Sequence, residues 1–140
     1  MKHLCISIVL LGALSIIANT EAIVQTCTPT SEECTTLAVA SENIPVSSCK
    51  RNAGIINVII ENRLQDPRDI TITLTGPKGS IVKNFTVPDT STTTIPFEGL
   101  TNGSYTVEAF AETGFCTFTC NIVVNNRILN CLPFLYCCCQ

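Results

Sequence analysis

The sequence predicts an all-β protein, an antiparallel β-sandwich of about seven strands that disulfide bonds staple together. Three observations support this fold class. Between residues 54 and 124, apolar and polar side chains alternate in short runs, and turn residues separate the runs about every 8 to 12 positions. No run shows a sustained helical period. The cysteines, 10 in the whole chain, lie on either side of residues 50–115, and none lies within that range.

Residues 1–22 have the layout of a cleavable secretory signal peptide. Lys2 precedes an apolar run over residues 4–18, and small side chains precede the expected cleavage between Ala22 and Ile23. The alternative, a signal anchor that stays in the membrane, needs an apolar run of about 20 residues. We therefore expect a chain that is secreted, extracellular or at the cell surface, with no transmembrane segment after the signal is removed.

Charge argues against a nucleic-acid partner. The formal net charge is −3, and the basic residues of the mature chain are scattered, with only Lys50 and Arg51 adjacent. A nucleic-acid-binding protein needs clustered cations to displace counterions from phosphates.

The sequence also argues against enzymatic activity. The single histidine, His3, lies in the signal peptide, so the mature chain has no imidazole for acid–base catalysis, nucleophile activation or zinc ligation. Five carboxylates offer an acid pair in principle, although exposed charges of this kind are far more common: Asp66, Asp69, Glu98, Glu108 and Glu112. We expect no catalytic residues, no cofactor and no metal.

In an exported chain, this density of cysteines predicts disulfide bonds. We expect the three cysteines before residue 50 to pair with three after residue 115. Six cysteines allow about 15 connectivities in all, and the sequence does not choose among them. Cys116 and Cys120 cannot pair with each other if they share an extended strand, because they would then be about 13 Å apart. The six candidates are Cys27, Cys34, Cys49, Cys116, Cys120 and Cys131.

The terminal run Cys137, Cys138 and Cys139 contains the candidates for a free or intermolecular thiol. Cleavage of the signal peptide leaves an odd number of cysteines, so at least one is unpaired within the chain. The alternatives are an internal or vicinal bridge, an intermolecular disulfide that makes a homodimer or attaches the chain to a matrix, and thiolate metal binding.

Four segments follow from these patterns: the signal peptide (1–22), a Thr/Ser-rich segment tied by disulfides (23–53), the sandwich core (54–124) and an apolar, Cys-rich tail (125–140). The second segment is predicted to be irregular except for an edge strand at residues 37–40. The tail is expected either to pack on the sandwich or to form an exposed apolar patch. Six further strands are predicted near residues 54–60, 69–75, 80–87, 92–97, 104–111 and 115–124.

The sequence also predicts where some of these strands lie within their sheets. Ile55 and Ile59 lie on the face opposite the core side chains of their strand, which predicts a central strand buried on both faces. Pro88 and Pro96 predict edge positions, because proline cannot donate a hydrogen bond to a neighbouring strand.

The segment Leu100-Thr-Asn-Gly-Ser-Tyr-Thr-Val107 resembles the turn into strand F of immunoglobulin-like and fibronectin-type sandwiches. That resemblance implies an immunoglobulin-like fold in which the hydroxyl of Tyr105 bonds back to the preceding backbone, the tyrosine corner. Extended through Gly114-Phe-Cys-Thr117, the pattern also resembles SprB-type repeats of bacterial surface adhesins over about residues 95–124. This second resemblance implies a role in surface adhesion.

Two Asn-x-Ser/Thr sequons make Asn84 and Asn102 candidates for glycosylation if the chain passes through a eukaryotic secretory pathway. We expect Asn84 to point away from its strand neighbour Phe85, and Asn102 to lie in a turn.

The leading functional hypothesis is a secreted, non-enzymatic binding or surface-adhesion module for a protein or glycan ligand. The alternative is a small cysteine-rich effector or inhibitor that uses an irregular loop such as residues 28–33. A third hypothesis is a coat or matrix protein linked through its terminal cysteines.

Overall fold

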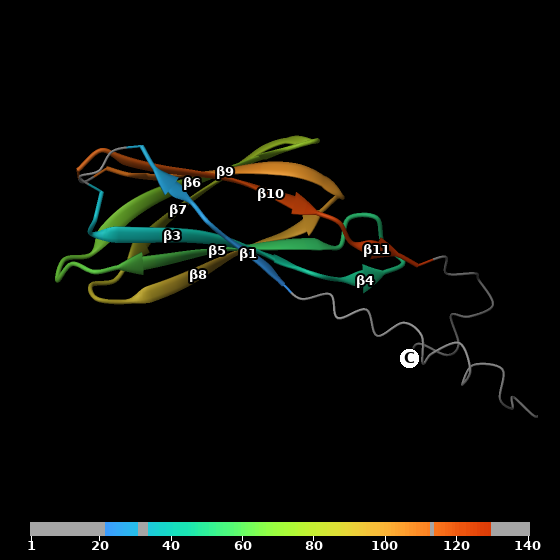
Figure 1. Cartoon of the computed structure of the whole chain (residues 1–140), viewed down its shortest axis with the longest axis horizontal. Helices are drawn as coiled ribbons and strands as arrows, with labels where there is room; N and C mark the ends of the chain where they lie inside the picture. Colours follow the sequence, from blue (N-terminus) through green and yellow to red (C-terminus); the bar gives the residue numbers. More distant parts are fainter. Residues whose placement is uncertain (1–21, 31–33, 113, 130–140) are drawn as a thin grey trace, which may run out of the picture.

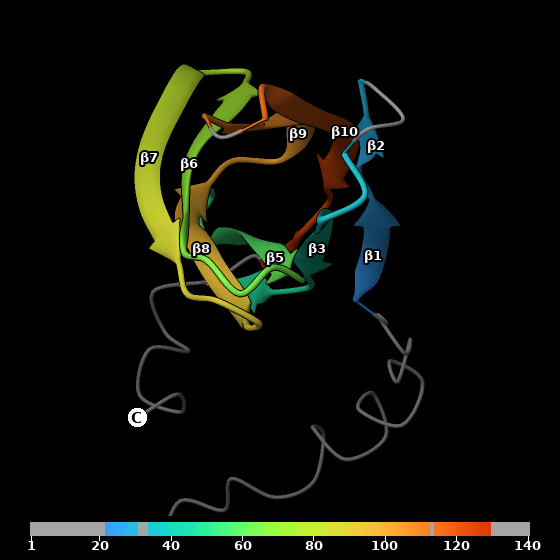
Figure 2. The same ribbon diagram turned by 90° about the vertical axis from the view of Figure 1, so that its left-hand side faces the viewer.

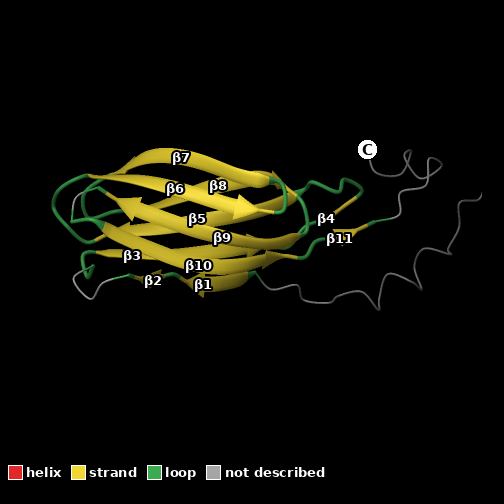
Figure 3. Cartoon of the chain, turned by 90° about the horizontal axis from the view of Figure 1, so that it is seen from above, coloured by secondary structure: helices red, strands yellow, loops and turns green. Residues whose placement is uncertain are grey.

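The computed structural model describes residues 22–30, 34–112 and 114–129, and these contain β-strands and no helix (Figures 1 and 3). Seven of the strands are eight or nine residues long and match the seven predicted runs. They are β3 (Leu37–Ile44), β5 (Gly54–Asn62), β6 (Arg68–Gly76), β7 (Gly79–Val87), β8 (Thr92–Leu100), β9 (Gly103–Ala111) and β10 (Cys116–Val124). The shorter strands are β1 (Ile23–Thr26), β2 (Thr28–Pro29), β4 (Ser47–Ser48) and β11 (Arg127–Ile128).

Two antiparallel sheets make the sandwich. One has the strand order β1-β3-β5-β8 and the other the order β2-β10-β9-β6-β7. Three pairs of long strands that follow one another along the chain are antiparallel partners within one sheet: β3 and β5, β6 and β7, and β9 and β10. The connections from β5 to β6, from β7 to β8 and from β8 to β9 cross between the sheets. These crossings are those of an immunoglobulin-like Greek-key sandwich, so the predicted fold class is confirmed.

The core follows directly from the alternation in sequence. Successive side chains of a strand point to opposite faces, and in β5 the inner set Ile56, Val58 and Ile60 is fully buried. In β6 the inner residues Ile72 and Leu74 are equally buried, whereas Thr73 between them is only half-buried. The same register puts Phe118 and Ile122 of β10 into the core between the two sheets.

A buried asparagine holds one end of the sandwich. Asn62 is 1 % exposed, and its Nδ2 donates to the carbonyls of Asp66 at 2.8 Å and Pro88 at 3.0 Å. Its Oδ1 accepts from the backbone N–H of Leu64 at 3.1 Å. One side chain thus ties the β5–β6 connection to the β7–β8 connection, and it does so with all of its polar atoms paired.

The N-terminal segment differs from the expectation of an irregular chain. Strand β1 pairs with β3, and the backbone N–H of Cys27 donates to the carbonyl of Val39 at 2.8 Å. The next residues then pair with the other sheet, since β2 lies against β10 and the N–H of Thr30 donates to the carbonyl of Thr117 at 2.8 Å. The chain therefore crosses from one sheet to the other along one side of the sandwich (Figure 2).

Three sequence-based expectations need correction. The strand at residues 37–40 extends to residue 44. It is not an edge strand, because β1 pairs with it on the side away from β5. Since β3 pairs with β5 along its whole length, the sandwich begins before residue 54. Ile55 and Ile59 are only half-buried, because no described element covers the outer face of β5. Pro96 does lie on an edge strand, β8.

Candidate functional site

Two disulfide bonds between described residues join the N-terminal segment to β10. Cys27 is bonded to Cys120 with a Cα–Cα distance of 4.5 Å, and Cys34 to Cys116 with a distance of 5.7 Å. The two cysteines of β10 thus bond elsewhere rather than to each other. All four are buried in the core, where the hydroxyl of Ser41 lies 3.2 Å from the sulfur of Cys120.

Cys49 is also disulfide-bonded, and its partner is not one of these four. The remaining cysteine candidates, Cys131 and Cys137 to Cys139, lie outside the described residues. The expected cleavage residues Ala22 and Ile23 are exposed at the start of the described chain.

Tyr105 makes the hydrogen bond that the immunoglobulin-like resemblance implies. Its hydroxyl donates to the carbonyl of Thr101 at 2.7 Å, and its side chain is 6 % exposed. The ring also packs on Gly76 so closely that any Cβ there would overlap it. Gly103 has a φ of +149° and lies against the ring of Pro77. The β8–β9 turn and the β6–β7 turn are therefore fitted to each other at this end of the sandwich.

The outer face of the sheet that contains β6, β7, β9 and β10 is mostly polar, although it also carries the exposed side chains of Val82 and Val123, and no described element covers it. The strand register aligns its side chains in rows across the four strands. Hydrogen bonds run along these rows, such as Thr106 to Asn121 at 3.0 Å and Thr75 with Ser80 at 2.9 Å. We call this set the polar face: Thr71, Thr73, Thr75, Ser80, Val82, Asn84, Thr106, Glu108, Phe110, Thr117, Thr119 and Asn121.

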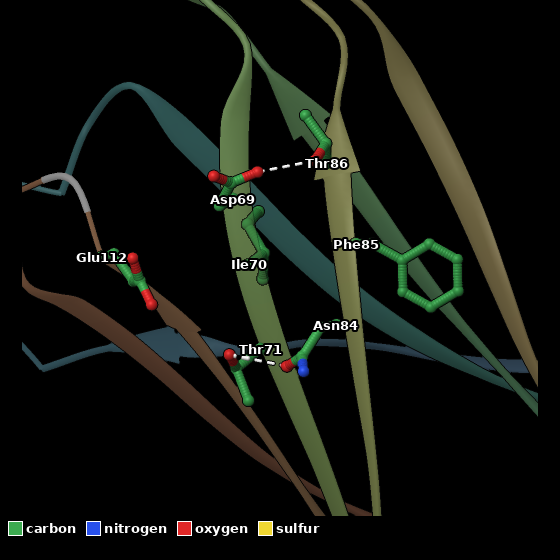
Figure 4. Close-up of a pocket in the computed structure, with 7 residues that line it drawn as sticks. All are labelled: Asp69, Ile70, Thr71, Asn84, Phe85, Thr86 and Glu112. Atoms are coloured by element: carbon green, nitrogen blue, oxygen red, sulfur yellow. Dashed lines mark hydrogen bonds between the residues drawn. The ribbon is translucent and has the colours of Figure 1, made fainter.

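A shallow groove of about 360 Å³ opens at the β7 side of this face (Figure 4). The hydroxyl of Thr86 donates to Asp69 Oδ1 at 2.6 Å, and the hydroxyl of Thr71 donates to Asn84 Oδ1 at 3.0 Å. Glu112 lies across the groove from β7, with its carboxylate exposed. The groove is lined by Asp69, Ile70, Thr71, Asn84, Phe85, Thr86 and Glu112.

Of the five candidate carboxylates, the structure brings only Asp69 and Glu112 into this groove. Within the described residues, no group of three or more His, Cys, Asp or Glu side chains is arranged to hold a metal ion. The chemistry on offer in the groove is hydrogen bonding through hydroxyl, amide and carboxylate groups.

The opposite outer face, on β1, β3, β5 and β8, has a different composition. The register places Ala40, Ile59 and Thr94 side by side, and Ile44 beside Ile55. We call this set the apolar face: Val24, Ala38, Ala40, Ile44, Ile55, Ile59 and Pro96. Its members are half-buried or exposed, and no described element covers them.

Polar side chains both divide and border the apolar face. Glu42 and Asn57 lie in one row across its middle, and Glu61 lies near its end. Glu61 accepts from Arg63 Nε at 3.1 Å and from a second guanidinium nitrogen at 3.4 Å. This hydrogen bond and the charge of Glu61 raise the pKa of Arg63.

The second glycosylation candidate has a structural role. Asn102 Nδ2 donates to the carbonyl of Asn126 at 2.9 Å, and the N–H of Asn126 donates to Asn102 Oδ1 at 2.8 Å. The side chain of Asn126 in turn accepts from the N–H of Val46 at 3.2 Å. Asn84 makes no such pair, although both asparagines are exposed.

Sequence analysis missed Lys83. This residue occupies an inward-facing position of β7, between Ile81 and Phe85, where alternation predicts an apolar side chain. Its ammonium group lies 4.5 Å from the centroid of the Phe97 ring and donates to the carbonyl of Pro96 on β8. A lysine in the core register of a strand was the signal that could have revealed it.

Comparisons with known proteins add little to this picture. No protein-family model and no curated protein sequence matches the chain. Among solved structures, it is similar to a DUF3244 family protein from Bacteroides vulgatus, described as having an immunoglobulin-like β-sandwich fold. The identity is 17 %, the match covers 71 % of this chain and 99 % of that one, and the TM-score is 0.41. The fold assignment therefore rests on the strand order and register of this chain.

Among the described residues, no helix has the length and apolar character that crossing a bilayer requires.

Proposed function

We propose that the chain is a secreted, non-enzymatic binding module, and that it binds a protein ligand through the apolar face. The observation that carries this proposal is the set of uncovered apolar side chains on β3 and β5: Ala40 lies beside Ile59 and Ile44 beside Ile55, in two rows on either side of Glu42 and Asn57. Apolar side chains on an uncovered face, together with polar ones, are typical of protein-interaction surfaces.

Charge favours a partner that places a basic residue opposite Glu42. The carboxylates of Glu42 and Glu61 lie on or beside the apolar face, and Arg63 is already paired with Glu61. The chain as a whole carries a net charge of −3. Complementary charge at the rim of an interface speeds association and selects between partners.

Export and an adhesive role remain parts of this proposal. Buried disulfide bonds support export, because they persist in oxidising compartments. The resemblance of residues 95–124 to SprB-type adhesin repeats supports a surface role. The inhibitor alternative is weakened, since Thr28 and Pro29 of its candidate loop are held in a sheet.

The test compares two substitutions at matched positions. Ile59 and Thr73 are both half-buried, on strands with neighbours on each side, one on the apolar face and the other on the polar face. A partner would be isolated from the medium or cell surface around the secreting cells and its affinity measured for wild type, Ile59→Glu and Thr73→Glu. We expect Ile59→Glu to weaken binding roughly tenfold or more, because it places a charge in the centre of the contact.

Thr73→Glu should leave the affinity unchanged. The reverse pattern would overturn the assignment of the face, and retention on polysaccharide in place of protein would overturn the ligand class. A wild-type dimer that Ile59→Glu converts to a monomer would show that a second copy of the chain covers this face, which also contradicts the proposal.

A further inference from the structure

The two sequons share a motif but lie in opposite structural settings, and from these settings we infer that Asn84 is an N-glycan acceptor in the folded protein, whereas Asn102 is not. This inference stands apart from the proposed binding function. It concerns the polar face and the end turn, not the apolar face.

Asn84 has the geometry of an accessible acceptor. It lies in the middle of β7, so the extended backbone puts Asn84 and Thr86 on the outer side and Phe85 against the core. Its Oδ1 accepts from the hydroxyl of Thr71, whereas no described residue hydrogen-bonds to Nδ2. Figure 4 shows the amide oxygen turned towards Thr71 and the nitrogen away from it.

The groove beside Asn84 offers room for the first sugar of a glycan. Its volume of about 360 Å³ falls at the lower end of the range of ~300 to 1,000 Å³ that small-molecule sites occupy. The carboxylates of Asp69 and Glu112 line it and are suited to accept hydrogen bonds from sugar hydroxyls. The groove is open to solvent, so the rest of a glycan would extend away from the sheet.

Both polar atoms of the Asn102 amide are already hydrogen-bonded. Its Oδ1 and Nδ2 pair with the N–H and C=O of one residue, Asn126. Such a reciprocal pair uses the amide hydrogen that lies on the same side as Oδ1. An N-glycosidic amide has the trans arrangement of a peptide bond, which places the sugar carbon on that same side. A glycan on Asn102 would therefore replace the hydrogen that bonds to Asn126.

Loss of that pair would extend beyond one hydrogen bond. Asn126 is buried, and its side chain holds the N–H of Val46 in the segment between β3 and β4. The Asn102–Asn126 pair thus links the β8–β9 turn, the end of β10 and the β3–β4 segment. A chain glycosylated at Asn102 cannot close this junction.

Glycosylation of Asn84 needs no oxidant or reductant. The co-substrate is an oligosaccharide linked to a lipid pyrophosphate in the secretory compartment. A bond forms between Asn84 Nδ2 and the anomeric carbon of the first sugar, the bond from that carbon to the pyrophosphate oxygen breaks, and one Nδ2 proton is lost. The lipid pyrophosphate is the leaving group.

The test removes each sequon without touching either asparagine. Thr86→Val abolishes the first sequon, and Ser104→Ala abolishes the second while leaving the Asn102–Asn126 pair intact, because Ser104 is exposed. The full chain would be secreted from eukaryotic cells with its own leader, treated with peptide N-glycosidase in ¹⁸O water, and its intact mass and peptides measured. Wild type and Ser104→Ala should carry the same single glycan, with the isotope incorporated only at residue 84.

Thr86→Val and Asn84→Gln should both lose the glycan. Thr86→Ser keeps a hydroxyl for both the sequon and Asp69, so this variant should retain the glycan. It separates loss of the sequon from any loss of folding. A secreted wild type without a glycan at residue 84, or with isotope at residue 102, would overturn the inference. A lower glycan mass in Ser104→Ala would do the same.

Discussion

Along one side of the sandwich the chain from Ile23 to Pro29 runs from β3 to β10, whereas along the other side β7 and β8 end the two sheets with no described strand between them (Figure 2). The first side is closed by backbone pairing and two disulfides. The second is bridged by Lys83, whose ammonium group reaches β8. Edge strands invite pairing with other chains, and this molecule protects its two sides by different means.

The difference has a consequence for function. A strand from a partner cannot pair with β3 or β10 unless the N-terminal segment is displaced, and an inward lysine is a known means of discouraging pairing at an edge such as β7. The two outer faces are covered by no described element and are open to a ligand. This is why the proposed function concerns a face of the sandwich and not one of its edges.

The largest loss of stability should come from removing a disulfide bond of the N-terminal segment. Replacing Cys27 and Cys120 together by alanine should lower the free energy of unfolding by about 2 to 5 kcal/mol, because the bond closes a loop between residues 93 positions apart. Guanidinium unfolding would measure it, with Thr117→Ala on the outer side of the same strand as control. A loss below ~1 kcal/mol would show that backbone pairing alone holds the segment.

A smaller effect is expected on the open side. Lys83→Met keeps the apolar stem but removes the ammonium group, and should cost about 1 kcal/mol through the lost contacts with the Phe97 ring and the Pro96 carbonyl. Lys78→Met, at an exposed turn, is the matched control and should change stability by less than ~0.5 kcal/mol. Equal effects of the two substitutions would show that the ammonium group of Lys83 does not stabilise this side of the sandwich.

The smallest effect should come from the side chains of β1. All four of its residues are exposed, so the segment contributes through its backbone and through Cys27, not through burial. Val24→Thr should therefore change the free energy of unfolding by less than ~0.5 kcal/mol. If thermal or denaturant unfolding showed a loss near ~2 kcal/mol, β1 would be packed against something outside the described residues.

The sequence predicted the seven long strands because each has the period-two alternation that a half-buried strand requires, as in Ile70, Ile72 and Leu74. The short strands β1 and β2 carry no such alternation, since neither packs a face on the core. Their place is set by pairing with residues far along the chain and by disulfides whose connectivity sequence leaves open.

The candidate surfaces were less predictable than the strands. The alternation that identified β5 could not tell whether Ile55 and Ile59 meet a second layer, and the structure leaves them uncovered. Likewise, the two sequons are equivalent as motifs. Only the pairing of Asn102 with Asn126, across 24 residues of sequence, distinguishes them.

Photo-crosslinking would show directly whether a protein ligand binds the apolar face. A photoreactive amino acid would replace Ile59 in one variant and Thr73 in another, and both would be exposed to light in the medium of the secreting cells. We expect one crosslinked protein species from position 59 and none from position 73. Crosslinks from position 73 alone, or from neither position, would contradict the proposal.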